Sequence, residues 1–179
     1  PNSMIIFGGG PIGIEMGQAF IRLGTKVYIV DRSDQILGKE DKDMADTVKQ
    51  VMESEGVVFH LNSSIEAVKN LGDDKEVTLK DIEGKTVRLN SKTILVAVGR
   101  TPNIHGLGLE GIGIKVNRTG IEVDNRLRTN HKHIYAAGDV NGGFLFTHAA
   151  GYEGGIVVSN AIFRLPRKTD YTYLPWCTY

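Results

Sequence analysis

The hexapeptide Gly8-Gly9-Gly10-Pro11-Ile12-Gly13 constrains the fold of this chain more than any other stretch. It follows the apolar run from Met4 to Phe7, which is typical of a buried strand, and it opens a stretch with helical periodicity. Its spacing matches GxGxxG, in which the glycines permit a tight turn, the approach of a pyrophosphate and close helix packing. The N–H groups and dipole at the helix start then favour phosphate. We interpret the stretch as a dinucleotide-binding turn, although GxGxxG alone also fits any tight strand-to-helix connection.

The residues after this turn predict a βαβ unit. Gly24 is placed to end the helix, and Val27 to Val30 has the composition of a buried parallel strand. Pro11 suits the first helical turn, where its missing N–H costs little. The helix is expected to bury a stripe made of Ile12, Met16, Ala19, Phe20 and Leu23.

An acid, Asp31, ends the second predicted strand, where the motif expects a carboxylate that binds the adenosine ribose. A carboxylate repels the 2′-phosphate of NADP, so the sequence favours NAD over NADP. The neighbouring Arg32 weakens this preference, because an arginine beside the ribose accommodates a phosphate. The alternative is that Asp31 is only a solvated strand end.

Further elements follow in a regular order. The polar stretch from Arg32 to Lys42 is expected to be a loop, and Asp41 or Asp43 to begin a second helix that ends at Gly56. The buried stripe of that helix should hold Met44, Val48, Val51 and Met52. Strands are predicted at 57–61, at 65–68, 76–80 and 86–89 as an antiparallel meander, and at 93–98. The predicted fold class is α/β, a Rossmann-like parallel sheet with an antiparallel β-meander.

The composition of the chain argues against several classes of function. The 179 residues carry 21 basic and 21 acidic side chains, so net charge is zero and no basic stripe suggests nucleic acid or an anionic membrane. No apolar run approaches the ~20 residues of a membrane helix. Cys177 is the single cysteine, which excludes a disulfide within the chain and favours the cytoplasm. We expect His60 to be a satisfied structural histidine and predict no metal site.

The later motifs resemble the flavin-dependent pyridine nucleotide–disulfide oxidoreductases. The resemblance covers nearly the whole chain and rests on the glycine turn followed by Glu15, the meander, the run Ala97–Asn103 and the segment from Thr129 to Asp139. Together with Asp31, the run Asp34-Gln35-Ile36-Leu37 is more similar to the dihydrolipoamide dehydrogenase branch than to the glutathione reductase branch.

This resemblance implies a domain organisation. Residues 1–100 correspond to the NAD(P)-binding domain, 101–165 to the C-terminal part of the FAD-binding domain, and 166–179 to the start of a truncated interface domain through which the parent protein forms a homodimer. The abrupt start at a core strand suggests a missing upstream segment that would complete the FAD site. The parent would transfer hydride between NAD(H) and FAD. The resemblance favours a disulfide or dithiol substrate and leaves lipoamide, mercuric ion and a second nicotinamide nucleotide open.

The resemblance also assigns roles to residues. Asp139, at the end of a short predicted strand 134–137, would accept a hydrogen bond from the ribityl chain of FAD. Without the resemblance, Asp139 fits equally well as a turn residue before Gly142-Gly143. The start of a predicted helix over 147–162 would face the flavin, with His148 acting through its backbone rather than as a catalytic side chain. Glu15 would support the nicotinamide side, unless it is only a first-turn acid favoured by the helix dipole.

No catalytic residue is expected in this chain, which has no Cys-x-x-x-x-Cys pair, so it should bind nucleotide without completing a redox cycle. A noncatalytic NAD-binding or sensing module remains the main alternative. A methyltransferase would leave the meander and Gly138-Asp139 without a role, and neither Tyr-x-x-x-Lys nor a P-loop is present. The predicted cofactor-binding residues are Gly8, Gly10, Pro11, Ile12, Gly13, Glu15, Asp31, Arg32, Gly99, Arg100, Gly138, Asp139, Thr147, His148 and Ala149.

Overall fold

A parallel sheet of four strands organises the first part of the chain in the computed structural model, which describes residues 1–178. The sheet has the order β3-β2-β1-β7. Its strands are β1 (Ser3–Phe7), β2 (Lys26–Val30), β3 (Val58–His60) and β7 (Thr93–Val96). Pairing is parallel throughout, with Ile5 opposite both Tyr28 and Ile94. The α/β class and the Rossmann-like sheet are therefore confirmed.

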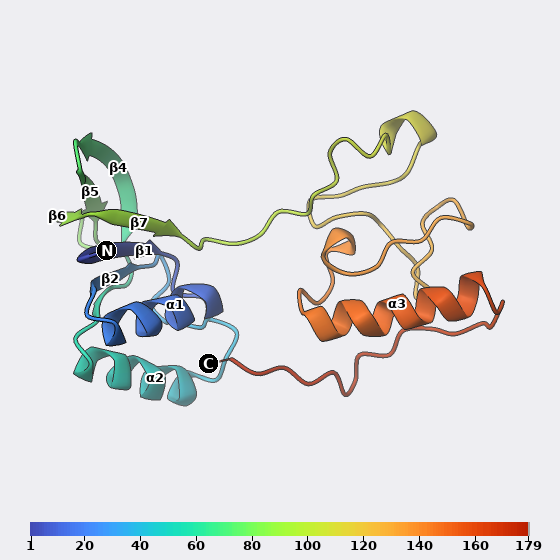
Figure 1. Ribbon diagram of the computed structural model, residues 1–179, viewed down its shortest axis with the longest axis horizontal. Helices are drawn as coiled ribbons and strands as arrows, with labels where there is room; N and C mark the ends of the chain where they lie inside the picture. Colours follow the sequence, from blue (N-terminus) through green and yellow to red (C-terminus); the bar gives the residue numbers. More distant parts are fainter. Residues whose placement is uncertain (179) are drawn as a thin grey trace. The chain divides into compact units, whose positions relative to one another are not determined.

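The two faces of this sheet are covered differently (Figure 1). Helices α1 (Pro11–Arg22) and α2 (Lys42–Ser54) pack on one face, where Met4 and Ile6 of β1 enter a core with Ile14 and Met52. On the other face, Ile5 and Phe7 pack against the second sheet. Because side chains alternate along a strand, the unbroken apolar run of β1 is buried on both sides.

The second sheet is the predicted antiparallel meander. It contains β4 (Ser64–Leu71), β5 (Asp74–Lys80) and β6 (Thr86–Ser91), in that order. Its central strand supplies Val77 and Leu79, which are almost fully buried against the parallel sheet. The β4–β5 pairing shifts between Ile65 and Ala67, so that β4 carries a bulge there.

The helix positions are as predicted, and the buried stripes are confirmed in part: Phe20 of α1 and Val48 of α2 pack against the core, and Met52 is fully buried. In α1 the buried residues are Gly13, Ile14 and Gly17, whereas Ile12 is 45% and Leu23 is 79% exposed. A Cβ atom on Gly17 would lie 2.8 Å from Ile29 Cδ1, so the glycines let α1 pack closely on the sheet. Counting large apolar residues therefore found Phe20 but missed the small residues on the buried side of α1. In α2, Asp41 is the N-cap, and Met44 is exposed while Ala45 is buried.

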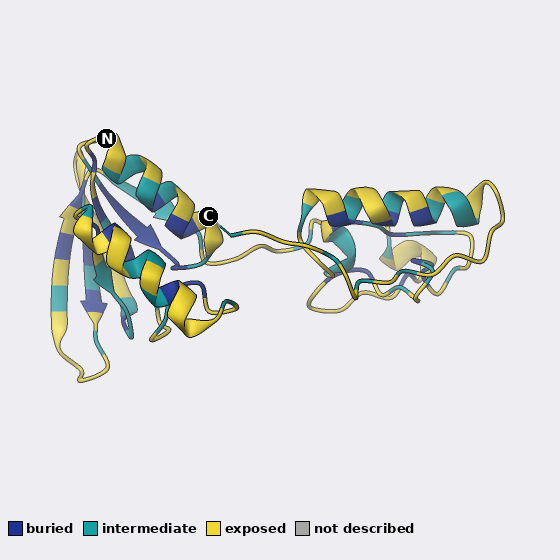
Figure 2. Ribbon diagram, turned by 90° about the horizontal axis from the view of Figure 1, so that it is seen from below, coloured by how far each residue is buried: buried dark blue, intermediate teal, exposed yellow. Residues whose placement is uncertain are grey.

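The chain divides into two compact units, residues 1–99 with Thr178, and residues 100–177. The second unit contains the short 3₁₀ turns η1 (Glu110–Ile112) and η2 (Asp139–Asn141) and the helix α3 (Thr147–Ala161). Its small core includes Ile114, Ile121 and Ala136. Buried positions of α3 lie on one side, at Ala149, Glu153 and Ile156 (Figure 2). No helix among residues 1–178 combines the length and apolarity needed to cross a membrane.

Candidate functional site

The turn between β1 and α1 requires two of its glycines for packing. Gly8 has φ +105°, and a Cβ atom there would lie 2.4 Å from the carbonyl oxygen of Ala97. A Cβ atom on Gly13 would lie 2.0 Å from the carbonyl oxygen of Gly8. No side chain fits at these distances, so both glycines are needed for the strand, the turn and the helix to meet.

Gly10 differs from its neighbours. It is the N-cap of α1, its φ of −78° is open to any residue, and no atom lies within 4 Å of the position that its Cβ would take. No side chain caps the N-terminus of α1, and Pro11 and Ile12 in its first turn are exposed. The protein does not need a glycine here for its own packing. The turn thus leaves open space beside uncapped N–H groups, the arrangement that suits a phosphate.

Asp31 is tied to this glycine turn. One carboxylate oxygen accepts a hydrogen bond from the backbone N–H of Gly9 at 2.6 Å, and the other accepts from Ser33 N at 2.7 Å. The side chain is half-buried, so the alternative of a solvated strand end does not describe it. Arg32 beside it is exposed. The structure thus brings Asp31 to the same edge of the sheet as the open position at Gly10.

Glu15 is exposed and lies in the second turn of α1, because the helix begins at Pro11. No acidic residue occupies the first turn. The alternative that Glu15 is a first-turn acid is therefore wrong, and its predicted place near the nicotinamide stays a prediction.

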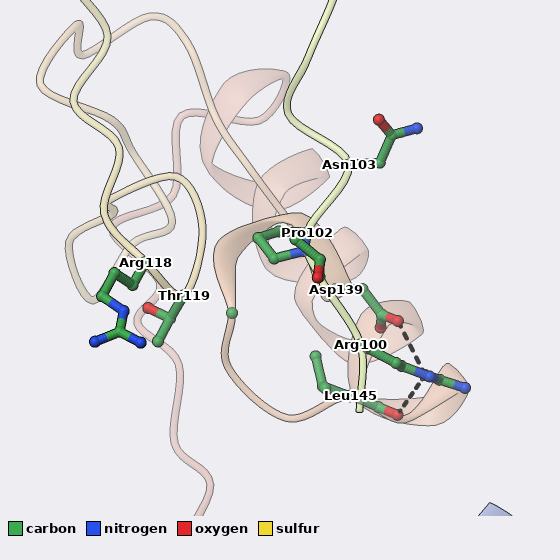
Figure 3. A pocket seen from close by; sticks show the side chains of 9 residues that line it. Arg100, Pro102, Asn103, Arg118, Thr119, Asp139 and Leu145 are labelled. Atoms are coloured by element: carbon green, nitrogen blue, oxygen red, sulfur yellow. Dashed lines mark hydrogen bonds and ion pairs between the residues drawn. The ribbon is translucent and has the colours of Figure 1, made fainter. Parts of the chain in front are cut away.

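Two further predicted residues, Arg100 and Asp139, line a pocket of about 440 Å³ in the second unit (Figure 3). Arg100 Nη1 lies 3.1 Å from Asp139 Oδ2 and 3.4 Å from the carbonyl oxygen of Leu145. Both charged side chains are about half exposed, so this ion pair is open to solvent and to a ligand. Arg118 and Thr119, which the sequence did not single out, also line the pocket. Gly99, just before Arg100, has φ +138°.

Asp139 begins the 3₁₀ turn η2 instead of following a strand. The predicted strand 134–137 is wrong: its one ladder contact among residues 1–178 is the isolated antiparallel bridge between Arg128 and Tyr135. A strand needs a continuous partner for its backbone groups, and 127–129 supply only a short one. The turn is fixed instead by Gly138, at φ +79°, and by Gly142, whose Cβ would lie 2.1 Å from the carbonyl oxygen of Thr119.

The N-terminus of α3 is close to its predicted position. The helix begins at Thr147, no side chain caps it, and Ala149 is fully buried. His148 stacks on Phe146 and its Nε2 lies 2.7 Å from the carbonyl oxygen of Pro175. The imidazole is thus engaged within the unit, which agrees with a structural side chain.

Sequence reasoning missed Glu153, which is 1% exposed and accepts hydrogen bonds from three donors around η2. The sequence does contain a sign that Glu153 is buried, because it is the single acid in a stretch from Ala149 to Val158 that is otherwise made mostly of apolar and small residues. An acid in such a stretch has to find partners when the helix packs.

Comparison with known proteins accounts for this arrangement. The family model described as pyridine nucleotide-disulphide oxidoreductase matches residues 1–154. The chain belongs to this family. The dihydrolipoyl dehydrogenase of Geobacillus stearothermophilus is 39% identical over 176 residues, which are 98% of the chain and 37% of that protein. The mercuric reductase of Bacillus cereus is 34% identical over 100% of the chain and 28% of its own length.

Solved structures similar to this chain point to the same family. The HOCl-induced flavoprotein disulfide reductase RclA from Escherichia coli matches with a TM-score of 0.86 and 33% identity, over 95% of the chain and 38% of that protein. The chain therefore spans less than two fifths of the relatives it matches. The sequence-based prediction of the pyridine nucleotide-disulphide oxidoreductase family is confirmed, and this family depends on FAD and NAD(P).

Proposed function

We propose that the chain is the nucleotide-binding part of an FAD-dependent NAD(P)H oxidoreductase. Residues 1–100 would bind NAD(H), residues 101–165 would complete an FAD site, and residues 166–179 would begin an interface domain through which the parent protein dimerises. The observation that carries the proposal is Gly10, which has nothing within 4 Å of its missing Cβ although Gly8 and Gly13 on either side are tightly packed. A glycine kept open in this way suits the approach of a pyrophosphate.

The NAD site would use the residues of the β1–α1 turn and the end of β2. The backbone of Gly8 to Gly13 and the uncapped start of α1 would hold the pyrophosphate. Asp31 has its carboxylate beside Gly9 and would accept hydrogen bonds from the ribose, which favours NAD over NADP. Glu15 is exposed on the same helix and would support the nicotinamide side.

The FAD site would use the pocket of the second unit. Arg100 would neutralise phosphate charge, and the half-exposed Asp139 would accept a hydrogen bond from a hydroxyl of the ribityl chain. The uncapped N–H groups at Thr147 to Ala149 would stabilise negative charge on the flavin. These donors and acceptors suit a ligand with both phosphates and hydroxyls. FAD would supply the hydride chemistry when bound.

The relatives act on different substrates by name, namely dihydrolipoyl groups, mercuric ion and, for RclA, disulfide. We propose a disulfide or dithiol substrate for the parent of this chain. We further propose that the chain alone binds nucleotide without turnover, because its one cysteine, Cys177, provides no dithiol. A noncatalytic NAD module would need the first unit only and would leave the paired Arg100 and Asp139 without a role.

Titration of the purified chain with NADH and NADPH separately, followed by nicotinamide fluorescence, tests the proposal. We expect tighter binding of NADH, and loss of this preference in Asp31→Ala. Glu110→Gln is the matched control, because Glu110 is an exposed acid of the second unit. Equal affinity for both nucleotides would contradict the assigned NAD preference, and absence of binding would contradict the nucleotide site.

A further inference from the structure

Glu153 is a buried carboxylate that the proposed binding roles do not use. It lies on the packed side of α3 and is 1% exposed. Burying a carboxylate is costly unless hydrogen bonds replace its water. Among residues 1–178, no lysine or arginine forms an ion pair with it. Its hydrogen bonds therefore have to explain why an acid occupies this position.

Three donors converge on this carboxylate. Oε2 accepts from the backbone N–H of Gly138 and from Asn141 Nδ2, each at 2.7 Å, and Oε1 accepts from the Tyr171 hydroxyl at 2.6 Å. Burial, and after it the hydrogen bond to Glu153, raises the pKa of Tyr171 above its usual value. The hydroxyl thus stays protonated and keeps donating. The two oxygens of the Glu153 carboxylate thus provide the acceptors that these three donors need.

Two of these donors lie on either side of Asp139. Gly138 precedes it, and Asn141 ends the 3₁₀ turn that Asp139 begins. The amide of Asn141 is itself held, because its oxygen accepts from Gly143 N at 2.9 Å. One carboxylate therefore fixes both ends of η2, while Asp139 itself stays half exposed toward the pocket.

We propose that Glu153 is a positioning residue for flavin: its buried carboxylate fixes the Gly138–Asn141 turn so that Asp139 presents its carboxylate to the ribityl chain of FAD. Because the hydroxyl of Tyr171 donates to Glu153, the position of the Glu153 carboxylate also depends on the segment 166–177, to which Tyr171 belongs. The inference rests on the proposed flavin site, and Glu153 acts through Asp139 without touching the cofactor.

The test compares four variants in the full-length protein that carries this chain. Glu153→Leu removes the acceptor, and Glu153→Gln keeps an oxygen for Gly138 and Asn141 while its amide group can donate to the Tyr171 oxygen. Tyr171→Phe removes one donor. Tyr173→Phe is its matched control, because Tyr173 is two residues away and 92% exposed.

The FAD dissociation constant is measured by flavin fluorescence, and hydrogen exchange of the Gly138 amide reports the turn itself. We expect Glu153→Leu to weaken FAD binding at least about tenfold, Tyr171→Phe about threefold, and Glu153→Gln and Tyr173→Phe less than about twofold, in keeping with the loss of buried hydrogen bonds. Exchange at Gly138 should accelerate in the same order, and NADH affinity should stay unchanged in all four.

The outcomes separate the two proposals. If the wild-type protein does not bind FAD, the proposed function is wrong. If the wild type binds FAD and Glu153→Leu binds it equally well, the positioning role is wrong and the flavin site stands. If Glu153→Leu fails to fold, the comparison of Tyr171→Phe with Tyr173→Phe takes its place. Weaker FAD binding by Tyr171→Phe at an unchanged melting temperature supports the positioning role of Glu153. Equal FAD binding by both tyrosine variants overturns it.

Discussion

Gly10 and Gly13 provide a comparison that separates a binding role from a packing role. At Gly10 no atom beyond the adjacent residues of the chain lies within 4 Å of the added methyl group, and φ is −78°. Alanine is a weaker N-cap than glycine by about 0.5–1 kcal/mol. It also restricts the unfolded chain, which stabilises the fold by about 0.4–1 kcal/mol. These terms oppose each other, so Gly10→Ala should change the free energy of unfolding by less than about 0.5 kcal/mol.

Gly13→Ala should behave differently, because its methyl group would lie 2.0 Å from the Gly8 carbonyl oxygen. The methyl carbon is bonded directly to the helix backbone and the oxygen belongs to the backbone of the turn, so relief requires the helix and the turn to move apart. Overpacking of this kind costs about 1–3 kcal/mol, and we expect the upper end. With a slope of about 2 kcal/mol per molar urea, the midpoint of unfolding should fall by about 1.5 M.

The assays are urea unfolding followed by circular dichroism and NADH binding followed by fluorescence, on the same preparations. Gly10→Ala should keep its unfolding midpoint and lose at least about tenfold in NADH affinity, or about 1.4 kcal/mol. Wild-type NADH affinity in Gly10→Ala would refute the reasoning, since the open space would then serve no pyrophosphate. A midpoint as low as that of Gly13→Ala would also refute it.

Three further predictions concern single side chains. Asp31→Asn should weaken NADH binding about tenfold in a fluorescence titration and lower the free energy of unfolding by about 1 kcal/mol. The reason is that an amide oxygen is a weaker acceptor for the N–H of Gly9 than a carboxylate oxygen. If neither NADH affinity nor the free energy of unfolding changes, the role of this contact is contradicted. Burial lowers the pKa of His60 in the folded protein, so the contribution of neutral His60 to stability is fully present above the pKa of about 6.5 in the unfolded chain and is lost as the pH falls toward the lower folded pKa. The urea midpoint of unfolding should therefore drop between pH 7.5 and 5.5, and it should drop less in His60→Phe. The same drop in both proteins would exclude His60 as the cause. Gly120→Ala should destabilise the second unit by about 3 kcal/mol, because its methyl group would lie 2.3 Å from the Val140 carbonyl oxygen. NADH affinity should not change. An unaltered melting profile would contradict the prediction, because it would mean that the backbone at Gly120 accommodates the methyl group without loss of stability.

The sequence predicted the elements of the first unit because their signals are local. The glycine turn, the buried strands and the alternation of the meander each set their own structure over a few residues. The predicted stripe of α1 was only partly right: Phe20 packs on the core, but Gly13 and Gly17 pack by being small, which a count of large apolar residues does not register. His60 was expected to be satisfied, yet its Nε2 is buried without a hydrogen-bond partner among residues 1–178.

The second unit was less predictable, because contacts between distant residues determine it. The strand expected at 134–137 depends on a continuous neighbour, which local composition does not reveal. The partners of Glu153 come from Gly138, Asn141 and Tyr171, which are up to 18 residues away. Asp31 shows the same limit: its position predicted a ribose contact, whereas its hydrogen bond to Gly9 required the folded turn.

The bulge in β4 has a consequence for the behaviour of the protein at high concentration. β4 is an edge strand of the meander, and an edge exposes backbone groups that can pair with another molecule. The pairing shift between Ile65 and Ala67 leaves Glu66 as an extra residue, and an exposed Lys69 follows. A kinked and charged edge resists intermolecular strand pairing. Deletion of Glu66 would remove the bulge and invert the side chains that precede it, so we expect aggregation to increase although Glu66 lies outside both proposed binding sites.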